Sequence, residues 1–476
     1  MSIDIAIALN RFGLGARPSR PEKLQARDWL KRQVEQFEPK SLAIAGQPSR
    51  ADIAGDFASY RLDRKDRRLA KNRGDTSAGM EQIDPVKLEK AVNTLRVHYM
   101  TAAHARISQA LETEADFAER LVHFWSNYFA VSVDKLSVLA LAGDHEFNAI
   151  RPNIMGTFAD LLIAAVTHPA MLLYLDQAQS IGPNSPAAQR VAARSGKKLG
   201  LNENLAREVL ELHTLGVRTV YDQVDVTEFA RALTGWTVGG MAKGPMQRLL
   251  RDNGKPGDSQ FLDAIHEPGD KSLLGRRYPQ EGELQARAML NDLAIHPASA
   301  RHVATKLAQH FVADVPPQSL VRRLEKAFLQ SGGDLPTIYK TLIDAPEAWS
   351  PTQAKFKSPW DWVISTLRAL NIREIADTRQ TVSMLAQLGQ PIWRPASPAG
   401  FLDISDSWAG GAALMRRAEI ASRLGDRSAN RVDARTLAPV IMPGQIGTVT
   451  AESIARAESP SQGLALLLLC PEFLRR

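Results

Sequence analysis

The chain has 476 residues, of which 44% are hydrophobic and 23% charged, the composition of an ordinary globular protein. At ~150 residues per domain, this length accommodates two or three domains. The net charge of +7, from 59 basic and 52 acidic residues, is small for the length. The basic tract at 61–73 has no interleaved aromatic residues, so we expect a solvated helix or loop there and no nucleic-acid partner.

A single cysteine, Cys470, excludes an intramolecular disulfide and a cysteine-rich metal site. No stretch reaches the ~18 consecutive apolar residues of a membrane span. The first residues lack a basic region ahead of their short apolar stretch, which contains Asp4. No signal peptide is therefore predicted, and we expect a cytoplasmic protein.

Helical periodicity dominates the chain. Predicted helices cover residues 86–111, 113–128, 158–174, 286–293, 298–312 and 319–331. Short strand signals occur at 218–221 and 236–238, and the segments 64–85, 179–199 and 238–261 have the composition of loops. The predicted fold class is mainly α, a multi-helix architecture with at most a small β-ribbon and several long loops.

The organisation into domains is weakly marked, because no repeat of fixed period is present. We place a boundary after residue 285. Residues 1–285 then form an N-terminal helical region with the segments 202–236 and 261–275, and residues 286–476 form a C-terminal helical region. The alternative is one integrated domain.

The segment 202–236 predicts two amphipathic helices joined by a turn. Asn202 is a suitable N-cap for the first helix, and Gly216 suits the left-handed position after its end. The second helix is expected to begin at Asp225, whose spacing to Glu228 resembles a capping box.

Polar side chains gather on one arc of the first helix, namely Asn204, Arg207, Glu208 and Glu211. One alternative is a polar pocket between the helices, to which Arg231 of the second helix contributes. The other is surface ion pairing, of Arg207 with Glu211 at i+4. Glu228 and Arg231 would pair in the same way at i+3. Each helix also carries two carboxylates three residues apart, Glu208/Glu211 and Asp225/Glu228, as in a carboxylate-bridged metal pair. Such sites normally add a Glu-x-x-His motif, which is absent from this segment. His213 shares its arc with Leu210, so we expect it to pack in the core.

Several motifs follow one another in a distinctive order: 10–16 (NRFGLGA), 124–132 (FWSNYFAVS), 169–176 (PAMLLYLD), 202–236, 266–275 (HEPGDKSLLG), 306–314 (KLAQHFVAD) and 388–391 (LGQP). In these motifs the chain resembles a bacterial domain-of-unknown-function family, DUF1800, over roughly residues 5–472. The resemblance implies a mostly helical bacterial protein that associates with a sulfatase-like partner protein. Many relatives carry export signals, so a periplasmic or exported location is the alternative to the cytoplasm.

The resemblance brings no established catalytic residue, and the chain departs from the pattern at three positions. Ser126, Tyr128 and Asn153 stand where relatives often have histidine. A metal site built on those histidines would lose its ligands here.

His266 is the leading candidate for proton transfer, because an imidazole titrates near neutral pH and this one lies in a turn-rich loop. Lys271 would hold an anionic group of the substrate. Asp270 would orient either His266 or Lys271. The alternative is a structural turn with His266 bonded to backbone. His145-Glu146 followed by Arg151 is a second candidate, but it is not a zinc-protease motif.

Nucleophile-elbow, P-loop and dinucleotide-binding patterns are absent from the sequence, which leaves a divalent metal open as a cofactor. We therefore hypothesise an enzyme that performs acid/base hydrolysis or transfer on a carbohydrate-, phosphate- or sulfate-like substrate. Glu208 or Glu211 would be the base and His266 the acid or base. The substrate would be bound by Arg207, Arg231, Lys271, Asn204, Glu146 and Arg151. The alternative is a noncatalytic scaffold or accessory partner of a sulfatase-like protein.

Overall fold

The computed structural model describes residues 3–18, 25–72, 85–196, 198–217, 220–241 and 255–476, and at 66–72 and 85–87 it describes the backbone alone. Within these ranges the protein is mainly helical, which confirms the predicted fold class. The described strands form two antiparallel pairs.

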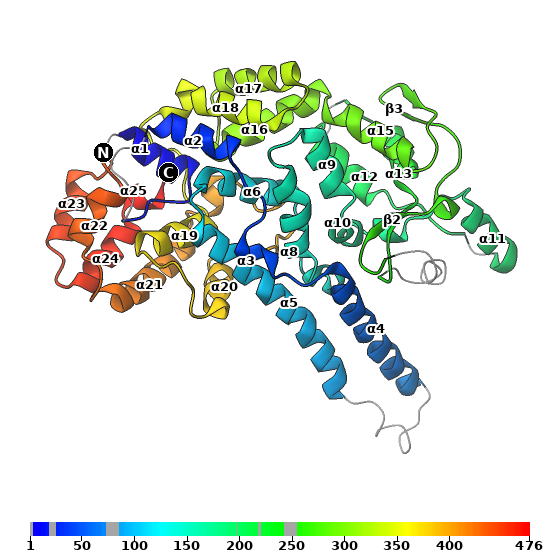
Figure 1. Ribbon diagram of the computed structural model, residues 1–476, viewed down its shortest axis with the longest axis horizontal. Helices are drawn as coiled ribbons and strands as arrows, with labels where there is room; N and C mark the ends of the chain where they lie inside the picture. Colours follow the sequence, from blue (N-terminus) through cyan, green and yellow to red (C-terminus); the bar gives the residue numbers. More distant parts are fainter. Residues whose placement is uncertain (1–2, 19–24, 73–84, 197, 218–219, 242–254) are drawn as a thin grey trace.

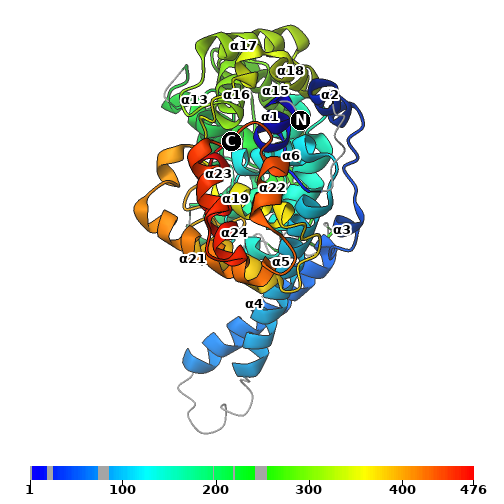
Figure 2. The ribbon, with the colours of Figure 1, turned by 90° about the vertical axis from the view of Figure 1, so that its left-hand side faces the viewer.

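The first elements lie beside the chain termini and in the centre of the molecule, and two of them form a projecting arm (Figure 1). They are α1 (Ile3–Ile7), the π-helix η1 (Ala8–Phe12), α2 (Ala26–Glu35), α3 (Leu42–Ala45), α4 (Arg50–Asn72), α5 (Pro85–Glu112) and α6 (Asp116–Tyr128). The far ends of α4 and α5 extend away from the body in both views (Figures 1 and 2). The near end of α5 packs against α19 and α20, and α6 packs against α2.

The middle of the chain holds short helices and all of the described strands. Its helices are α7 (Leu136–Leu139), α8 (Ala142–Asp144), η3 (His145–Ile150), η4 (Arg151–Asn153), α9 (Phe158–Val166), α10 (Pro169–Tyr174), η5 (Gln177–Gln179), α11 (Pro186–Ser195), α12 (Asn204–Glu208), η6 (Val209–His213), α13 (Gln223–Leu233) and η7 (Asp263–Ile265). Strand β1 (Trp236–Val238) pairs with β2 (Ser259–Phe261), Trp236 opposite Phe261. Strand β3 (Lys271–Leu273) pairs with β4 (Arg276–Tyr278), Lys271 opposite Tyr278.

The remaining helices cover the upper edge and the end of the molecule that holds both termini (Figure 1). They are α15 (Glu283–Ala294), α16 (Pro297–Phe311), α17 (Gln318–Ser331), α18 (Leu335–Asp344), η8 (Pro346–Trp349), α19 (Pro359–Ala369), α20 (Thr378–Gln387), η9 (Ser405–Ser407), α21 (Gly411–Ser428), α22 (Ala434–Ile441), α23 (Thr448–Ala455), α24 (Pro460–Leu469) and α25 (Pro471–Leu474).

The buried apolar side chains form one contiguous cluster that extends from Ile5 to Leu474. A small satellite cluster of Ile181, Ala187, Ala188 and Ile265 packs α11 against η7. Helix α15, which follows the predicted boundary at 285, packs against α9 and α13 of the N-terminal region. The division into two regions stays a prediction.

Three of the predicted loop and strand segments differ from the structure or lie partly outside the described residues. The expected loop at 64–85 is wrong in its first part, because α4 continues to Asn72. The expected loop at 179–199 contains α11, whose N-cap Ser185 accepts a hydrogen bond from the Ala188 amide. Of the strand expected at 218–221, residues 218 and 219 lie outside the described residues, and 220 and 221 are not in a strand.

The start of α13 also differs from the expectation. The capping box lies one turn earlier, with Asp222 as the N-cap and Asp225 as its reciprocal partner. Asp222 accepts from the amides of Val224 and Asp225, so it satisfies two helix donors that Asp225 would have left free.

Candidate active site

A cavity of about 290 Å³ lies where segments from the N-terminal and C-terminal parts of the chain meet. Its charged and titratable lining residues are Arg106, Arg120, His123, Glu211, His302, Lys306, His310, Asp361, Asp403 and Arg476. Its aromatic lining residues are Phe124, Tyr128, Trp360, Trp393, Phe401 and Trp408. Converging polar groups among aromatic walls are typical of small-molecule sites.

Helix α16 presents three of these residues. His302, Lys306 and His310 are four residues apart, so they share one face of the helix. The helix begins at Pro297, and the His296 side chain accepts a hydrogen bond from the Ala298 amide at 3.1 Å. This N-cap fixes the start of α16, and the regular helix then carries the face to the cavity.

Helix α6 and the loop after residue 398 meet through Asn127. Its side-chain nitrogen donates to the Phe401 carbonyl at 2.9 Å, and its oxygen accepts from the Phe401 amide at 2.8 Å. Gly400 has φ +76°, and a Cβ there would lie 2.4 Å from the Asn127 carbonyl oxygen. The close approach therefore requires glycine, and it holds the loop that carries Asp403 against α6.

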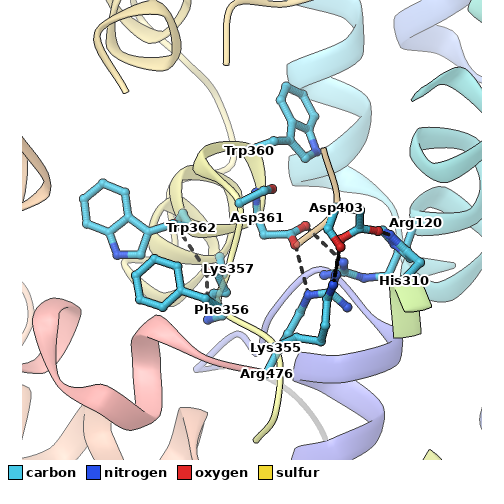
Figure 3. A network of polar contacts seen from close by, with 12 residues as sticks. Arg120, His310, Lys355, Phe356, Lys357, Trp360, Asp361, Trp362, Asp403 and Arg476 are labelled. Carbon is cyan, nitrogen blue, oxygen red and sulfur yellow. Dashed lines mark hydrogen bonds and ion pairs between the residues drawn. The ribbon is translucent and has the colours of Figure 1, made fainter. Parts of the chain in front are cut away.

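His310 and Asp403 form a pair, seen on the right-hand side of Figure 3. His310 Nδ1 bonds Asp403 Oδ2, while His310 Nε2 is enclosed and has no hydrogen-bond partner among the described residues. Burial lowers the pKa of His310 to about 4, although Asp403 opposes the shift. The imidazole is therefore neutral at neutral pH, and the network assigns its proton to Nδ1, which leaves the Nε2 lone pair available.

Lys355 contacts both the backbone and the carboxylate of Asp403. Its buried ammonium donates to the Asp403 carbonyl at 2.6 Å and to Asp314 Oδ1 at 2.7 Å, and it lies 3.1 Å from Asp403 Oδ1. Burial raises the pKa of Asp403, but His310 and Lys355 outweigh it, so this pKa lies well below its usual range. Asp403 is thus an anion that holds the imidazole in one orientation.

Asp361 lies between two arginines on the same side of the cavity (Figure 3). Arg120 Nη1 is 3.0 Å from Asp361 Oδ1, and Arg476 Nε is 3.0 Å from Asp361 Oδ2. Arg120 also donates to the Gly13 carbonyl at 2.8 Å. Burial opposes the charge of Asp361, but Arg120 and Arg476 outweigh it and lower its pKa.

Arg106 forms another wall of the cavity. Its guanidinium lies over the ring of Trp360 at 4.4 Å and over Trp393 at 5.3 Å, and its Nε is 3.2 Å from Glu146 Oε1. Glu146 Oε2 accepts from Ser126 Oγ at 2.6 Å and from Trp393 Nε1 at 2.8 Å. Glu146 is therefore a fully buried anchor of the wall.

Of the predicted substrate-binding residues, Arg151 lies one layer further in. Both carboxylate oxygens of Glu119 are 2.5 Å from Arg151 Nη2, and Glu119 Oε1 is 3.4 Å from His123 Nε2. Burial raises the pKa of Glu119, but Arg151 and His123 outweigh it and lower this pKa to about 2. Glu119 and Arg151 thus support His123, which lines the cavity.

Of the residues predicted on the first helix of the 202–236 segment, one lines the cavity. Glu211, in the π-helix η6, lines it. Arg207 is 3.7 Å from Glu211 and 3.3 Å from Glu203, so the expected i+4 ion pair is present. Partial burial and the charge of Glu211 raise the pKa of Glu208, and Asn204 is exposed at the first turn.

The predicted residues near the 261–275 loop are held by local bonds. His266 Nδ1 is 2.7 Å from the Thr234 carbonyl, and Lys271 donates to the Glu267 and Gly269 carbonyls. Burial lowers the pKa of both groups. Arg231 pairs with Glu228 at 2.5 Å, the other expected ion pair. The described lining of the cavity includes none of His266, Lys271 and Arg231. Their functional roles stay predictions.

The sequence prediction missed the cavity residues His310, Asp403, Asp361, Arg120 and Arg476. One signal was available for the first of them. Lys306 and His310 lie in the motif 306–314, and with His302 they repeat a basic residue every fourth position. The two aspartates lie outside the recognised motifs, and tertiary contacts bring them to the site.

Two further findings concern the described residues. No group of three or more His, Cys, Asp or Glu in the described ranges is placed to hold a metal ion. None of the helices described here is both long and apolar enough to cross a membrane.

The comparison with known families identifies the chain. The model of a family described as a protein of unknown function (DUF1800) matches residues 7–475. No curated protein and no solved structure shows significant similarity. The match covers nearly the whole chain, in agreement with the motifs at 124–132 and 306–314, which contribute residues to the cavity. The chain therefore belongs to the DUF1800 family.

Proposed function

We propose that the cavity is the active site of an enzyme in which His310 transfers a proton during hydrolysis or group transfer on a small polar substrate. The observation that carries the proposal is the His310–Asp403 pair. Asp403 holds one ring nitrogen of His310, and the other nitrogen has no hydrogen-bond partner among the described residues.

The neighbouring groups support the same chemistry. In its neutral form His310 accepts a proton from water or from a hydroxyl nucleophile, and the Asp403 carboxylate stabilises the imidazolium that forms. Arg120 and Arg476 offer positive charge to an oxygen that becomes negative in the transition state. The aromatic walls, among them Trp360 and Trp393, offer flat apolar surface to a ring or a sugar.

Glu211 is the second candidate acid/base group, because it also lines the cavity. Glu208, one turn away, has a raised pKa that suits proton exchange nearer to neutral pH. A carbohydrate-, phosphate- or sulfate-bearing molecule is the proposed substrate class.

A noncatalytic scaffold is the competing proposal, favoured by the closed ion pairs of the cavity. Asp361 is satisfied by Arg120 and Arg476, and Lys355 by Asp314 and Asp403, as a structural network requires. In this proposal the protein is an accessory to a sulfatase-like partner, in the cytoplasm or after export.

Turnover of chromogenic phosphate, sulfate and glycoside esters separates the two proposals. We expect the wild type to hydrolyse at least one class, and His310→Asn to lose ~10²–10⁴-fold in rate, because general acid/base catalysis contributes that much. The matched control is His104→Asn, an exposed histidine bonded to Thr378 Oγ1. Equal rates for wild type and His310→Asn would contradict the enzyme proposal.

A further inference from the structure

Five buried basic side chains lie around Asp361 and its partner Arg476, and we call them the cation cluster: Arg11, Arg120, Lys357, Arg417 and Arg476. None of the five is more than 2% exposed. Figure 3 shows Arg120, Lys357 and Arg476 on the sides of Asp361. Asp361 acts electrostatically on Arg417, and Arg476 acts electrostatically on Arg11.

Neutral groups accept from part of the cation cluster, while Arg11 Nε and Arg417 Nε and Nη1 have no hydrogen-bond partner among the described residues. Arg11 donates to the carbonyls of Ala348 and Thr352, both at 2.7 Å. Arg417 donates to the Lys357 carbonyl at 2.8 Å. The Lys357 ammonium donates to Ser365 Oγ at 3.1 Å and lies 4.0 Å above the Phe473 ring.

The guanidinium groups of the cluster outnumber the carboxylates that pair with them. Asp361 forms its ion pairs with Arg120 and Arg476, while Asp403 is engaged by His310 and Lys355. Buried charge without a counter-charge is unfavourable in a low-dielectric interior. An additional anion near Asp361 would relieve this excess.

Arg476 gives the place where such an anion would bind. Its side chain is 1% exposed, it lines the cavity, and its Nη1 has no hydrogen-bond partner among the described residues. Arg120 lines the cavity beside it. Guanidinium groups bind phosphate and sulfate oxygens through parallel N–H bonds, so an unused donor at a cavity points to an oxyanion.

We propose that Arg476 and Arg120 form a subsite for a tetrahedral oxyanion, a phosphate or sulfate group of the ligand, and that Lys357 takes up a proton when the anion binds. This inference rests on the proposed function, since it names the substrate class of the same cavity. It assigns the anionic group to the floor around Asp361, close to the His310–Asp403 pair.

The proton uptake follows from the contacts of Lys357, whose ammonium is buried, donates to Ser365 Oγ at 3.1 Å and forms no ion pair with a carboxylate among the described residues. Burial lowers its pKa to about 7, with Arg120 and Arg476 acting in the same direction and Asp361 and Cys470 against it. The charged and titratable groups that face it are Asp361 of α19, Arg120 of α6, Cys470 after α24, Arg417 of α21 and Arg476. An anion near Arg476 raises the pKa of Lys357, so binding and protonation favour each other.

Calorimetric titration of the full chain with sulfate tests the subsite, because sulfate keeps its charge between pH 6 and 9. We expect saturable binding at pH 6 that weakens as the pH rises through 7. The loss is about tenfold for each unit by which the bound anion raises the pKa of Lys357. In buffers of different ionisation enthalpy the wild type should show proton uptake near pH 7.5. Absence of saturable sulfate binding, or binding without proton uptake, overturns the proposal.

Single substitutions test whether Arg476 binds the sulfate and whether Lys357 causes the pH dependence. Arg476→Gln should weaken sulfate binding at least tenfold, and Lys357→Met should remove the pH dependence. The control Arg322→Gln, on the exposed face of α17, should change neither. If Arg476→Gln does not fold, the wild-type proton uptake still decides the outcome. Phosphate should bind like sulfate, whereas equal affinity for acetate would overturn the tetrahedral assignment.

The His310→Asn variant separates this inference from the proposed function. It should bind sulfate like the wild type while it loses turnover. Sulfate binding without any effect of His310→Asn on turnover contradicts the enzyme proposal alone. Lost turnover in His310→Asn without sulfate binding by the wild type contradicts the anion subsite alone.

Discussion

The turn at 266–271 and the floor of the cavity both bury titratable side chains, but they satisfy them differently. In the turn, His266 and Lys271 bond to backbone carbonyls within the loop or at the end of α13. On the cavity floor, His310 Nε2 and Arg476 Nη1 have no hydrogen-bond partner among the described residues. Buried polar groups are normally paired, so the exceptions beside a cavity are the candidates for ligand contact.

We expect the largest effect on the cavity floor, at Asp361. Asp361→Asn should lower the free energy of unfolding by ~3–5 kcal/mol, because it leaves Arg120 and Arg476 buried without their carboxylate. Denaturant unfolding measures the loss. The matched control is Asp344→Asn, whose surface pair with Lys31 should contribute less than ~1 kcal/mol. Equal losses in both variants would mean that the cavity pairs are no more important than surface ones.

His213 is an unpartnered histidine that does not line the described cavity. It is fully buried, neither ring nitrogen has a hydrogen-bond partner in the described ranges, and burial lowers its pKa to about 3. Between pH 6.5 and 3 the unfolded state therefore binds more protons, and stability falls as the pH falls.

His213→Phe should remove this acid sensitivity. The decrease in unfolding free energy between pH 7 and pH 4.5 should be ~2–3 kcal/mol smaller than in the wild type, since one pKa unit corresponds to ~1.4 kcal/mol. Denaturant unfolding at the two pH values provides the measurement. The same decrease in both proteins would show that His213 keeps an ordinary pKa.

Much of the fold could be predicted from the sequence, because helical periodicity is local. The helix expected at 298–312 is α16 at Pro297–Phe311, and the strand expected at 236–238 is β1. The segment 179–199 was misjudged because its Ser, Pro and Gly content resembles a loop, although Ser185 and Pro186 start a helix.

The site was harder to predict, because distant segments assemble it. The charge of the 202–236 block is visible in sequence, and Glu211 does line the cavity. Asp361, however, meets Arg120 of α6 and Arg476 only in the folded chain, and Asp403 likewise meets His310 of α16. Whether a histidine is satisfied, as His266 is by Thr234, depends on tertiary hydrogen bonds that no local pattern encodes.

Lys271→Met should have an intermediate effect. It leaves two carbonyls, of Glu267 and Gly269, without their buried donor, and we expect a loss of ~1–3 kcal/mol in unfolding free energy with turnover unchanged. Thermal or denaturant unfolding and an activity assay together decide the case. Unchanged stability with lost turnover would instead favour the predicted anion-binding role of Lys271.

The smallest effect is expected at Arg231. The Arg231 side chain, which pairs with Glu228, is 40% exposed to solvent. Arg231→Gln should therefore change the unfolding free energy by less than ~1 kcal/mol and leave turnover unaltered. Parallel unfolding and activity measurements test this. A large fall in substrate affinity would extend the site to α13.

Turnover of the His310→Asn and His266→Asn variants, measured side by side on the best substrate of the wild type, tests the central claim most directly. We predict that His310→Asn loses ~10²–10⁴-fold in rate, while His266→Asn keeps the wild-type rate because its ring supports only a turn. Lost turnover in His266→Asn, with His310→Asn fully active, would contradict this prediction. It would instead favour an active site in the 261–275 loop, as the sequence predicted.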